Sequence, residues 1–146
     1  MVKHTYQNAV QMRIVLDTNC LLVSVQAYSE FFWLWQAFRA EKITLCYTTE
    51  ILNEYYEVLS YYYSVSFAET VVDEILLSPN TIPVTVYYKW HLITVDHDDN
   101  KFVDCAISAN ATCIVTNDHH FNVLKKISFP PIKVVSIETF KSILKL

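Results

Sequence analysis

Residues 96–118 read DHDDNKFVDCAISANATCIVTND, and this stretch decides the fold. Apolar side chains recur at helical spacing through Asp98–Asn110, directly after an acidic cluster. Thr112–Thr116 is then a short apolar run, which is typical of a strand buried on both faces. A helix that leads straight into a fully buried strand favours a parallel sheet covered by helices.

The same alternation of helices and buried strands extends outward in both directions. Met12–Leu16 is a second apolar run, and it ends at Asp17. The other expected strands are Ile43–Tyr47, Thr81–Val86 and Val134–Val135, and the expected helices are Thr18–Val25, Ser29–Ala40, Thr49–Tyr62, a helix capped by Ser66 with Glu69, and Ile137–Leu144. The chain contains no repeat and no linker-like segment. Residues 1–146 therefore predict a single α/β domain, a three-layer α/β/α sandwich around a mostly parallel sheet.

Composition excludes several function classes. The 146 residues contain no glycine, which excludes a GxGxxG dinucleotide loop, a glycine-rich phosphate loop and a GxSxG nucleophile elbow. Turns must then come from Asn, Asp, Pro and Ser. With 11 basic and 15 acidic residues the net charge is −4, so the composition by itself does not indicate nucleic-acid binding.

The cysteines and the N-terminus bear on the cellular compartment. The four cysteines are widely spaced and each lies in an apolar run, which predicts buried, reduced thiols: Cys20, Cys46, Cys105 and Cys113. The first residues lack the apolar stretch of a signal peptide, and no run approaches the roughly 20 residues that span a bilayer. We expect a soluble, cytoplasmic protein without a membrane partner.

Carboxylates fall where an α/β sheet binds its ligands, beyond the carboxyl ends of the strands. Asp17 ends the first strand, and Asp118 follows the strand Thr112–Thr116. A third group, Asp96, Asp98 and Asp99, precedes a helix. A single acid at a strand end is often only a turn former or helix cap, but this combination indicates a functional site.

Helical geometry sorts the remaining acids, at about 100° per residue. Asp99 falls inside the apolar arc of its helix, whereas Asp104 falls on the side expected to face water. In Thr49–Tyr62, Glu54 lies at the rim of the buried face, and Glu50 and Glu57 are expected to face solvent.

Asp17, Glu54, Asp99 and Asp118 together offer oxygen ligands only, which suits one or two Mg²⁺ or Mn²⁺ ions rather than zinc. Four carboxylates brought together would repel one another unless divalent cations neutralised them. The chemistry that uses such a site is the hydrolysis of a phosphate ester.

Four motifs then resemble the PIN-domain ribonucleases, in particular the branch that comprises toxin components of toxin–antitoxin systems. They are IVLDTN at 14–19, TTEILNEYYEVL at 48–59, DHDDNKFVDCAISANA at 96–111 and IVTNDHHF at 114–121. The resemblance implies a Rossmann-like sandwich and a Mg²⁺- or Mn²⁺-dependent endoribonuclease that cuts RNA. It also implies a partner antitoxin and a homodimer. Its four catalytic, metal-binding acids fall on Asp17, Glu54, Asp99 and Asp118, and its supporting polar positions on Thr18, Asn19 and Thr116, with Asn117 beside them.

The sequence departs from the family pattern at three positions. Asn110 and Asn117 stand where the family usually has glycine, and Asn is the next-best residue for a left-handed backbone. His120 stands where an acid is often found; it and His119 could touch phosphate, but we favour the interpretation that both are exposed loop histidines.

Surface signals for partners are open to two interpretations. Some lysines could contact phosphate near the site or belong to an ordinary charged surface: Lys101, Lys125, Lys126 and Lys133. The aromatic residues of 28–40 and 55–63 could form an exposed interface patch or pack in the core.

Alternative functions are weaker but not all excluded. A phosphatase of the haloacid dehalogenase type needs a second acid where this chain has Asn19, and a receiver domain needs a lysine at a strand end where this chain has Asp118. A flap-type nuclease needs a larger chain. The remaining alternative is a PIN module that binds RNA or a protein partner without catalysis.

Overall fold

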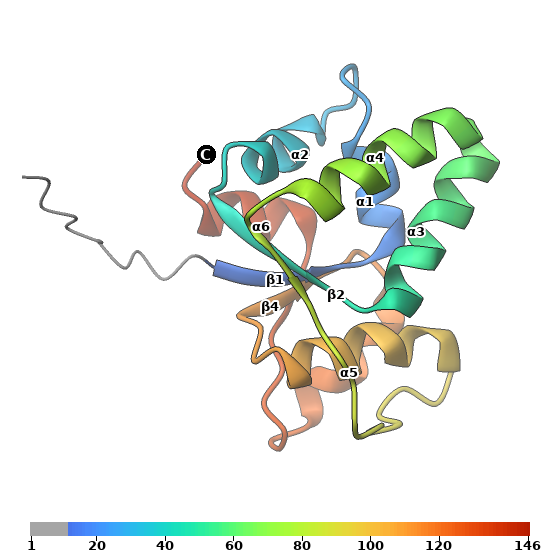
Figure 1. Cartoon of the computed structure of the whole chain (residues 1–146). Coiled ribbons are helices and arrows are strands. Elements are labelled where there is room, and N and C mark those ends of the chain that lie inside the picture. Colours follow the sequence, from blue (N-terminus) through green and yellow to red (C-terminus); the bar gives the residue numbers. More distant parts are fainter. Residues whose placement is uncertain (1–11) are drawn as a thin grey trace, which may run out of the picture.

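The computed structural model describes residues 12–146 as a sheet between two layers of helices (Figure 1). The strands are β1 (Met12–Leu16), β2 (Ile43–Tyr47), β3 (Thr81–Pro83), β4 (Cys113–Val115) and β5 (Val134–Val135). Their order is β3-β2-β1-β4-β5, and each neighbouring pair is parallel. Residues 1–11 of the predicted domain lie outside the described residues. The prediction that the N-terminus lacks a signal peptide falls mainly on them.

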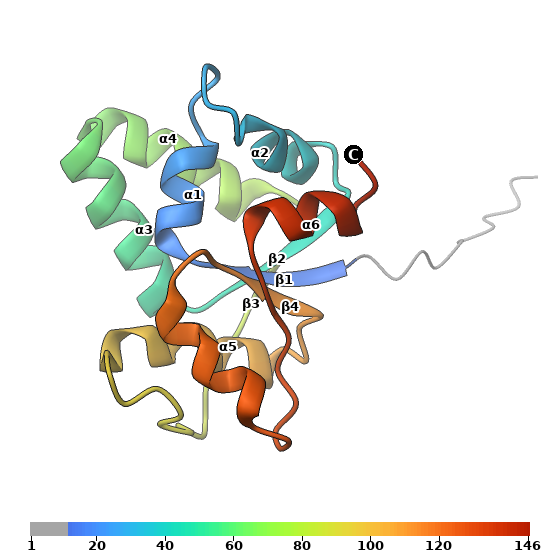
Figure 2. The same ribbon diagram turned by 180° about the vertical axis from the view of Figure 1, so that it is seen from behind.

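Helices cover both faces of this sheet. They are α1 (Thr18–Ser24), α2 (Phe32–Arg39), α3 (Thr49–Tyr62), α4 (Val65–Leu77), α5 (Asn100–Ser108) and α6 (Ile137–Ile143), with the 3₁₀ helices η1 (His97–Asp99) and η2 (His119–Lys126). Figures 1 and 2 show α1, α2, α4 and α6 above the sheet and α5 below it. The predicted three-layer α/β/α sandwich is confirmed. Among the described helices, none is both long and apolar enough to cross a membrane.

The central strands are buried as their apolar sequences predict. Every residue of β2 and β4 is buried, and so are the last three residues of β1. The four cysteines are free and buried, in agreement with the sequence prediction. Burial raises the pKa of the Cys20 and Cys105 thiols to about 12, so both remain protonated near neutral pH.

Three predicted element boundaries are wrong. The predicted helix Ser29–Ala40 begins only at Phe32, because the chain at Ser29 forms a turn in which Phe32 N donates to Ser29 O. The predicted strand Thr81–Val86 ends at Pro83, because its partner β2 ends at Tyr47 and the chain there turns into α3. The predicted cap Ser66 lies inside α4, since the hydroxyl of Ser64 accepts the hydrogen bond from Phe67 N at 3.0 Å.

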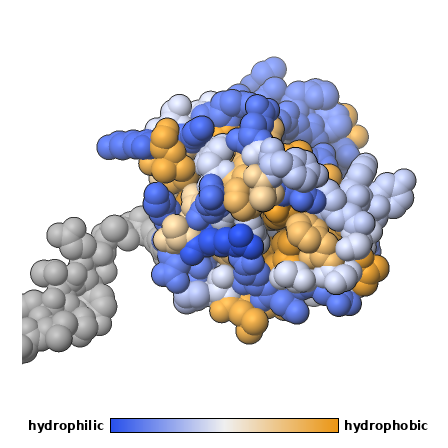
Figure 3. All heavy atoms as spheres, turned by 90° about the horizontal axis from the view of Figure 1, so that it is seen from above, coloured by the Kyte–Doolittle hydropathy of each residue, from blue (hydrophilic) through white to orange (hydrophobic). Residues whose placement is uncertain are grey.

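The aromatic residues divide between the core and the surface. Trp35, Phe38 and Tyr55 are buried, whereas Tyr28 and Tyr61 are exposed. Seen from above, apolar surface emerges in several separate places between hydrophilic side chains (Figure 3). Core packing is therefore confirmed for Trp35, Phe38 and Tyr55, whereas an interface formed by the exposed aromatics stays a prediction.

Asn80 ties the start of β3 to the rest of the sheet. Its side chain is buried and donates hydrogen bonds of 2.8 Å to the carbonyls of Phe38 and Ile43, while its own carbonyl accepts from Leu45 N at 3.0 Å. The Asn80 amide thus satisfies two backbone acceptors where α2 turns into β2.

Replacing Asn80 with alanine should lower the free energy of unfolding by about 2–4 kcal/mol, since two buried carbonyls lose their donor. Urea unfolding followed by circular dichroism would measure this as a lower midpoint at an unchanged m value. The control is Asn53→Ala on the exposed face of α3, which should change stability by less than about 0.5 kcal/mol. Equal effects of the two substitutions would contradict this role of Asn80.

Candidate active site

The pairing of β1 with β4 brings the first and fourth predicted acids together. The chain leaves β1 toward β2 on one side of the sheet and later reaches β4 on the other, so the carboxyl ends of these two strands form a switch point. There the hydroxyl of Thr116 donates to Asp17 Oδ2 at 2.7 Å and accepts from Asp118 N at 3.0 Å. Asp17 and Asp118 thus lie on either side of one threonine.

Helix α3 supplies Glu54. The phenol of Tyr55 donates to the carbonyl of Leu16, the last residue of β1, and so fixes α3 against the strand end. Glu54, one residue earlier, accepts from the hydroxyl of Thr18 and pairs with Lys101 Nζ at 2.7 Å. This carboxylate is therefore compensated by donors of the protein itself.

Asp99 is the most enclosed acid of the cluster at the start of α5. Asp96, three residues earlier, caps η1 by accepting from Asp98 N at 3.0 Å, and the Asp99 side chain makes no capping hydrogen bond at the start of α5. Asp99 is only 8% exposed, and its Oδ2 has no hydrogen-bond partner within residues 12–146. The carboxylate points toward His120, whose Nδ1 lies 3.4 Å away.

Burial and mutual repulsion raise the pKa of the enclosed acids. Burial first, and then the neighbouring carboxylates of Asp118, Asp96 and Asp17, together raise the pKa of Asp99 to about 6, while the contact with His120 opposes the shift. The pKa of Asp17 is raised by burial first and then by Asp118 and Glu54, while Thr116 opposes the shift. The four predicted acids therefore form one electrostatic cluster.

The donor set fits a divalent cation. A buried carboxylate oxygen without a partner is costly in a protein interior unless a cation or a donor satisfies it. Asp99 Oδ2 is such an atom, and the neighbouring ligands are mostly hard oxygens of the kind that Mg²⁺ and Mn²⁺ prefer. Asp17, Asp99 and Asp118 would hold the ion, whereas Glu54 is paired with Lys101.

The supporting polar residues take different places. Thr18 and Thr116 donate to Glu54 and Asp17, as described above. Asn19 is exposed and lines a hollow of about 300 Å³ together with Asp17 and Asp118. The Asn117 side chain lines the same hollow, and its Oδ1 accepts from Ile137 N at 3.1 Å, at the start of α6.

Among the predicted phosphate-binding lysines, the structure brings Lys101 to the acids. Its side chain is 7% exposed and lies between Glu54 and Asp98. Lys125 and Lys133 line a different hollow with Thr112, beside the amino ends of β4 and β5. They lie at the edge of the sheet opposite Asp17, so they do not contribute to this site.

Two sequence predictions about side-chain exposure are wrong. His119 is 84% exposed as expected, but His120 is only 27% exposed and its ring lies against Asp99 and Asp118. Asp104, expected to face water, is buried and accepts from Trp90 N at 3.0 Å. Asp104 is covered by the segment before α5 that contains Trp90, whereas His120 is turned toward the acids of η1 and of the turn before η2.

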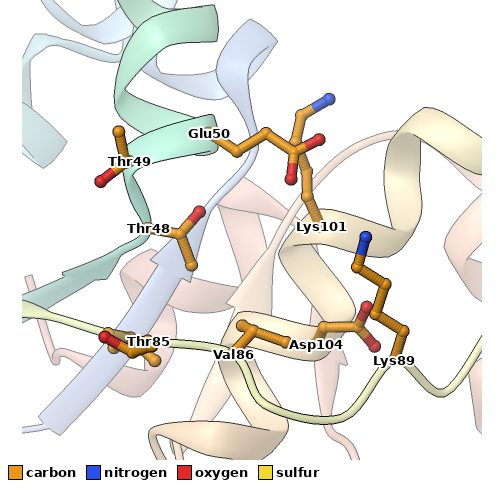
Figure 4. Close-up of a pocket in the computed structure, with 9 residues that line it drawn as sticks. Thr48, Thr49, Glu50, Thr85, Val86, Lys89, Lys101 and Asp104 are labelled. Atoms are coloured by element: carbon orange, nitrogen blue, oxygen red, sulfur yellow. The ribbon is translucent and has the colours of Figure 1, made fainter.

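The segment that covers Asp104 connects β3 to η1. Asn100 holds it with two hydrogen bonds to Ile93, from Ile93 N at 2.9 Å and to Ile93 O at 2.8 Å. Sequence reasoning missed this role of Asn100, since an amide at the start of a helix is usually taken for a cap. The segment and α5 enclose a hollow of about 260 Å³ lined by Thr48, Glu50, Lys89, Lys101 and Asp104 among others (Figure 4).

The pKa of Asp99 predicts how stability depends on pH. The group titrates near 6 in the folded chain and near 4 when unfolded, so the folded state binds its proton more tightly. Stability should fall as pH rises from about 4 to about 6 and stay lower above that. In a chelating buffer, Asp99→Asn should therefore melt at a higher temperature than the wild type at pH 7.5, and the difference should vanish near pH 4.

Asp98→Asn is the control for this measurement, because the Asp98 side chain is 86% exposed. Its melting temperature should follow that of the wild type at both pH values. A lower melting temperature for Asp99→Asn at pH 7.5 would show that protein donors already satisfy the Asp99 carboxylate.

Comparison with known proteins identifies the family of this chain. The PIN domain family model matches residues 13–120. No curated protein sequence matches the chain at a significant level.

Two solved structures share the fold. One is VapBC2 from Rickettsia felis bound to a DNA fragment from its promoter; its matched chain is 19% identical, with a TM-score of 0.61, and the match covers 86% of this chain and 98% of that one. The other is DNA-bound VapBC from Salmonella typhimurium, at 14% identity and a TM-score of 0.57, covering 87% of this chain and 99% of that one. The family match includes all four clustered acids, from Asp17 to Asp118, and the chain belongs to the PIN domain family.

Proposed function

We propose that this protein is a metal-dependent endoribonuclease that hydrolyses RNA phosphodiester bonds. The observation that carries the proposal is the buried carboxylate of Asp99, whose Oδ2 is unpartnered among the described residues and lies in one electrostatic cluster with Asp17 and Asp118. A cation-dependent site explains why a chain would bury acids that repel one another.

The bound Mg²⁺ or Mn²⁺ would supply an activated water and stabilise the charge that develops on the phosphate. The residues of this chain position the ligands for it. Thr116 orients Asp17, and Asp118 Oδ1 accepts from His120 N at 2.9 Å, which fixes the turn into η2. Glu54 is oriented by Thr18 and Lys101 on the opposite side. The carboxylates of Asp17, Glu54 and Asp118 are thus each preorganised by a neighbouring donor.

Lys101 and Lys89 place positive charge beside the acids, in a hollow that Glu50 and Asp104 also line. Lys101 and Lys89 line the same hollow, which adjoins Glu54 through the Lys101 ion pair (Figure 4). A phosphate next to the scissile bond could be neutralised there in spite of the overall charge of −4. The choice of RNA as substrate rests on the resemblance of the motifs to the PIN-domain ribonucleases.

For the cellular role we propose the toxin of a type II toxin–antitoxin pair, a cytoplasmic homodimer held by an antitoxin protein. The two structural neighbours come from VapBC structures, which supports this role. Exposed apolar side chains at the turn between α3 and α4, namely Tyr61, Tyr62 and Val65, offer a surface for such a partner.

A second candidate is a PIN module that binds RNA or a protein without catalysis. The ion pair between Lys101 and Glu54 favours it, because one of the four acids is already neutralised by the protein. Metal-dependent cleavage distinguishes the two candidates.

Cleavage of a mixed single-stranded RNA pool should require Mn²⁺ or Mg²⁺ and should fall by more than about 100-fold in Asp17→Asn, which keeps the shape of the side chain but loses a charged ligand. Gel analysis of labelled RNA would measure the rate. The matched control is Asp73→Asn on the exposed face of α4, which should cleave like the wild type.

Equal cleavage by the wild type and Asp17→Asn would identify a contaminating nuclease. If neither cuts while Mn²⁺ still raises the melting temperature of the wild type, the non-catalytic candidate replaces the nuclease.

Lys101→Gln should weaken RNA binding in the Asp17→Asn background, where cleavage is blocked. Glutamine keeps a donor for Glu54 but removes the charge, so the slope of log affinity against log salt should fall by about 0.7. Filter binding at several salt concentrations would measure the slope. Lys125→Gln is the control and should leave it unchanged, because Lys125 lies at the opposite edge of the sheet. If Lys125→Gln lowers the slope and Lys101→Gln does not, the RNA binds along the amino ends of β4 and β5 instead.

A further inference from the structure

His120 brings the imidazole of η2 into the carboxylate cluster. The sequence at 118–121 predicts two exposed histidines, yet the two rings have different surroundings. His119 is 84% exposed and its Nδ1 lies 3.9 Å from Asp118 Oδ1. His120 is turned inward, and its Nδ1 lies 3.4 Å from Asp99 Oδ2 and 3.5 Å from Asp118 Oδ1.

Two polar atoms face each other here without a hydrogen bond. Asp99 Oδ2 and His120 Nδ1 are both shielded from solvent, and neither has a hydrogen-bond partner within the described part of the chain. Asp99 is more than nine-tenths buried. The two atoms are close enough to attract each other but are not aligned for a hydrogen bond, so a hard oxygen and an aromatic nitrogen both keep a lone pair for a shared ligand.

The surrounding groups form two trios that both include His120. Ligand atoms of Asp96, Asp99 and His120 lie within 4.8 Å of one another, and so do those of Asp118, His119 and His120. The first trio would let one cation contact a nitrogen and two oxygens at once. His120 is common to both trios, and its Nδ1 is the nitrogen within reach of a cation at Asp99.

We propose that His120 Nδ1 is a nitrogen ligand of the divalent cation held by Asp99, and that it biases this site toward Mn²⁺ over Mg²⁺. The inference rests on the proposed metal-dependent function and specifies the donor set of that site. Mg²⁺ prefers oxygen ligands, whereas imidazole suits the transition metals.

The orientation of His120 is built into the backbone. Asp118 accepts from His120 N at 2.9 Å, and this bond starts η2 with the His120 ring directed toward Asp99. Phe121, the next residue, is buried and packs against Phe102 of α5 at 6.3 Å between ring centroids. The ring of His120 is therefore held between a capping carboxylate and a core anchor, as a preorganised ligand should be.

Electron paramagnetic resonance of bound Mn²⁺ tests the assignment without any activity measurement. Spin-echo modulation detects ¹⁴N nuclei of a directly coordinated imidazole. The wild-type protein loaded with one equivalent of Mn²⁺ should show this modulation, His120→Gln should lose it, and His119→Gln should retain it. His119→Gln is the matched control because it changes the neighbouring, exposed ring.

Metal selectivity supplies a second readout. Calorimetric titration should show that His120→Gln lowers the affinity for Mn²⁺ by about tenfold and that for Mg²⁺ by less than about twofold. His120→Asp replaces the nitrogen with an oxygen ligand, so it should still bind metal but lose the preference for Mn²⁺. This variant separates the loss of a ligand from a general disturbance of the site.

The outcomes distinguish this inference from the proposed function. If Mn²⁺ binds but the wild type shows no ¹⁴N modulation, or if His120→Gln retains it, His120 is not a ligand and the oxygen-only site stands. If the wild type binds no Mn²⁺ at all, both the assignment of His120 and the metal-dependent nuclease are overturned.

Discussion

The parallel pairing of β1 with β4 is the constraint on which the rest of the structure depends. Its register places Leu16 beside Val115, so Asp17 and Thr116 are the first residues beyond the paired ends and share a hydrogen bond. The chain runs from β1 through β2 and β3 on one side and then crosses to β4 on the other side of β1. This reversal of direction leaves a crevice at the carboxyl ends of β1 and β4. Tyr55 then attaches α3 to the same end through Leu16, which brings Glu54 to the crevice. The site therefore follows from strand order and from hydrogen bonds to the last residues of two strands.

The acids of the site repel one another and differ in how their negative charge is compensated. Glu54 is stabilised by Thr18 and by the nearly buried ammonium of Lys101, so its charge is compensated within the protein. Asp99 lacks such a donor within residues 12–146, and its pKa is raised to about 6 by burial and by the neighbouring carboxylates. The demand for an external cation thus concentrates on the side of Asp99 and Asp118, where His120 lies. A chain that only needed a rigid fold would gain stability by replacing Asp99 with a neutral side chain.

The sequence allows the sheet and the four acids to be predicted, because short apolar runs report burial on both faces and acids at strand ends report the binding edge. It does not allow the environment of Asp104 or His120 to be predicted. A helical wheel describes one helix against one core, whereas Asp104 is covered from outside by the irregular segment that contains Trp90. That segment has no periodicity, and Asn100 fixes it through Ile93 by contacts that spacing cannot reveal. The predicted place of Lys125 near the acids is wrong for a related reason. Helix η2 carries the chain from the edge where the acids lie back to the amino ends of the strands.

In this chain without glycine, asparagine stands at two positions where the family usually has glycine, and the two asparagines have different structural roles. Asn110 follows α5 with φ of 49°, a left-handed conformation that asparagine tolerates better than other side chains, so here the amide replaces glycine as a helix terminator. Asn117 is not among the described residues with positive φ, and its side chain instead accepts from Ile137 N at the start of α6. At this position the backbone makes no demand for glycine, and the amide links the turn after β4 to the helix that follows β5. Because that turn also carries Thr116 and Asp118, the asparagine stabilises the strand end from which both project.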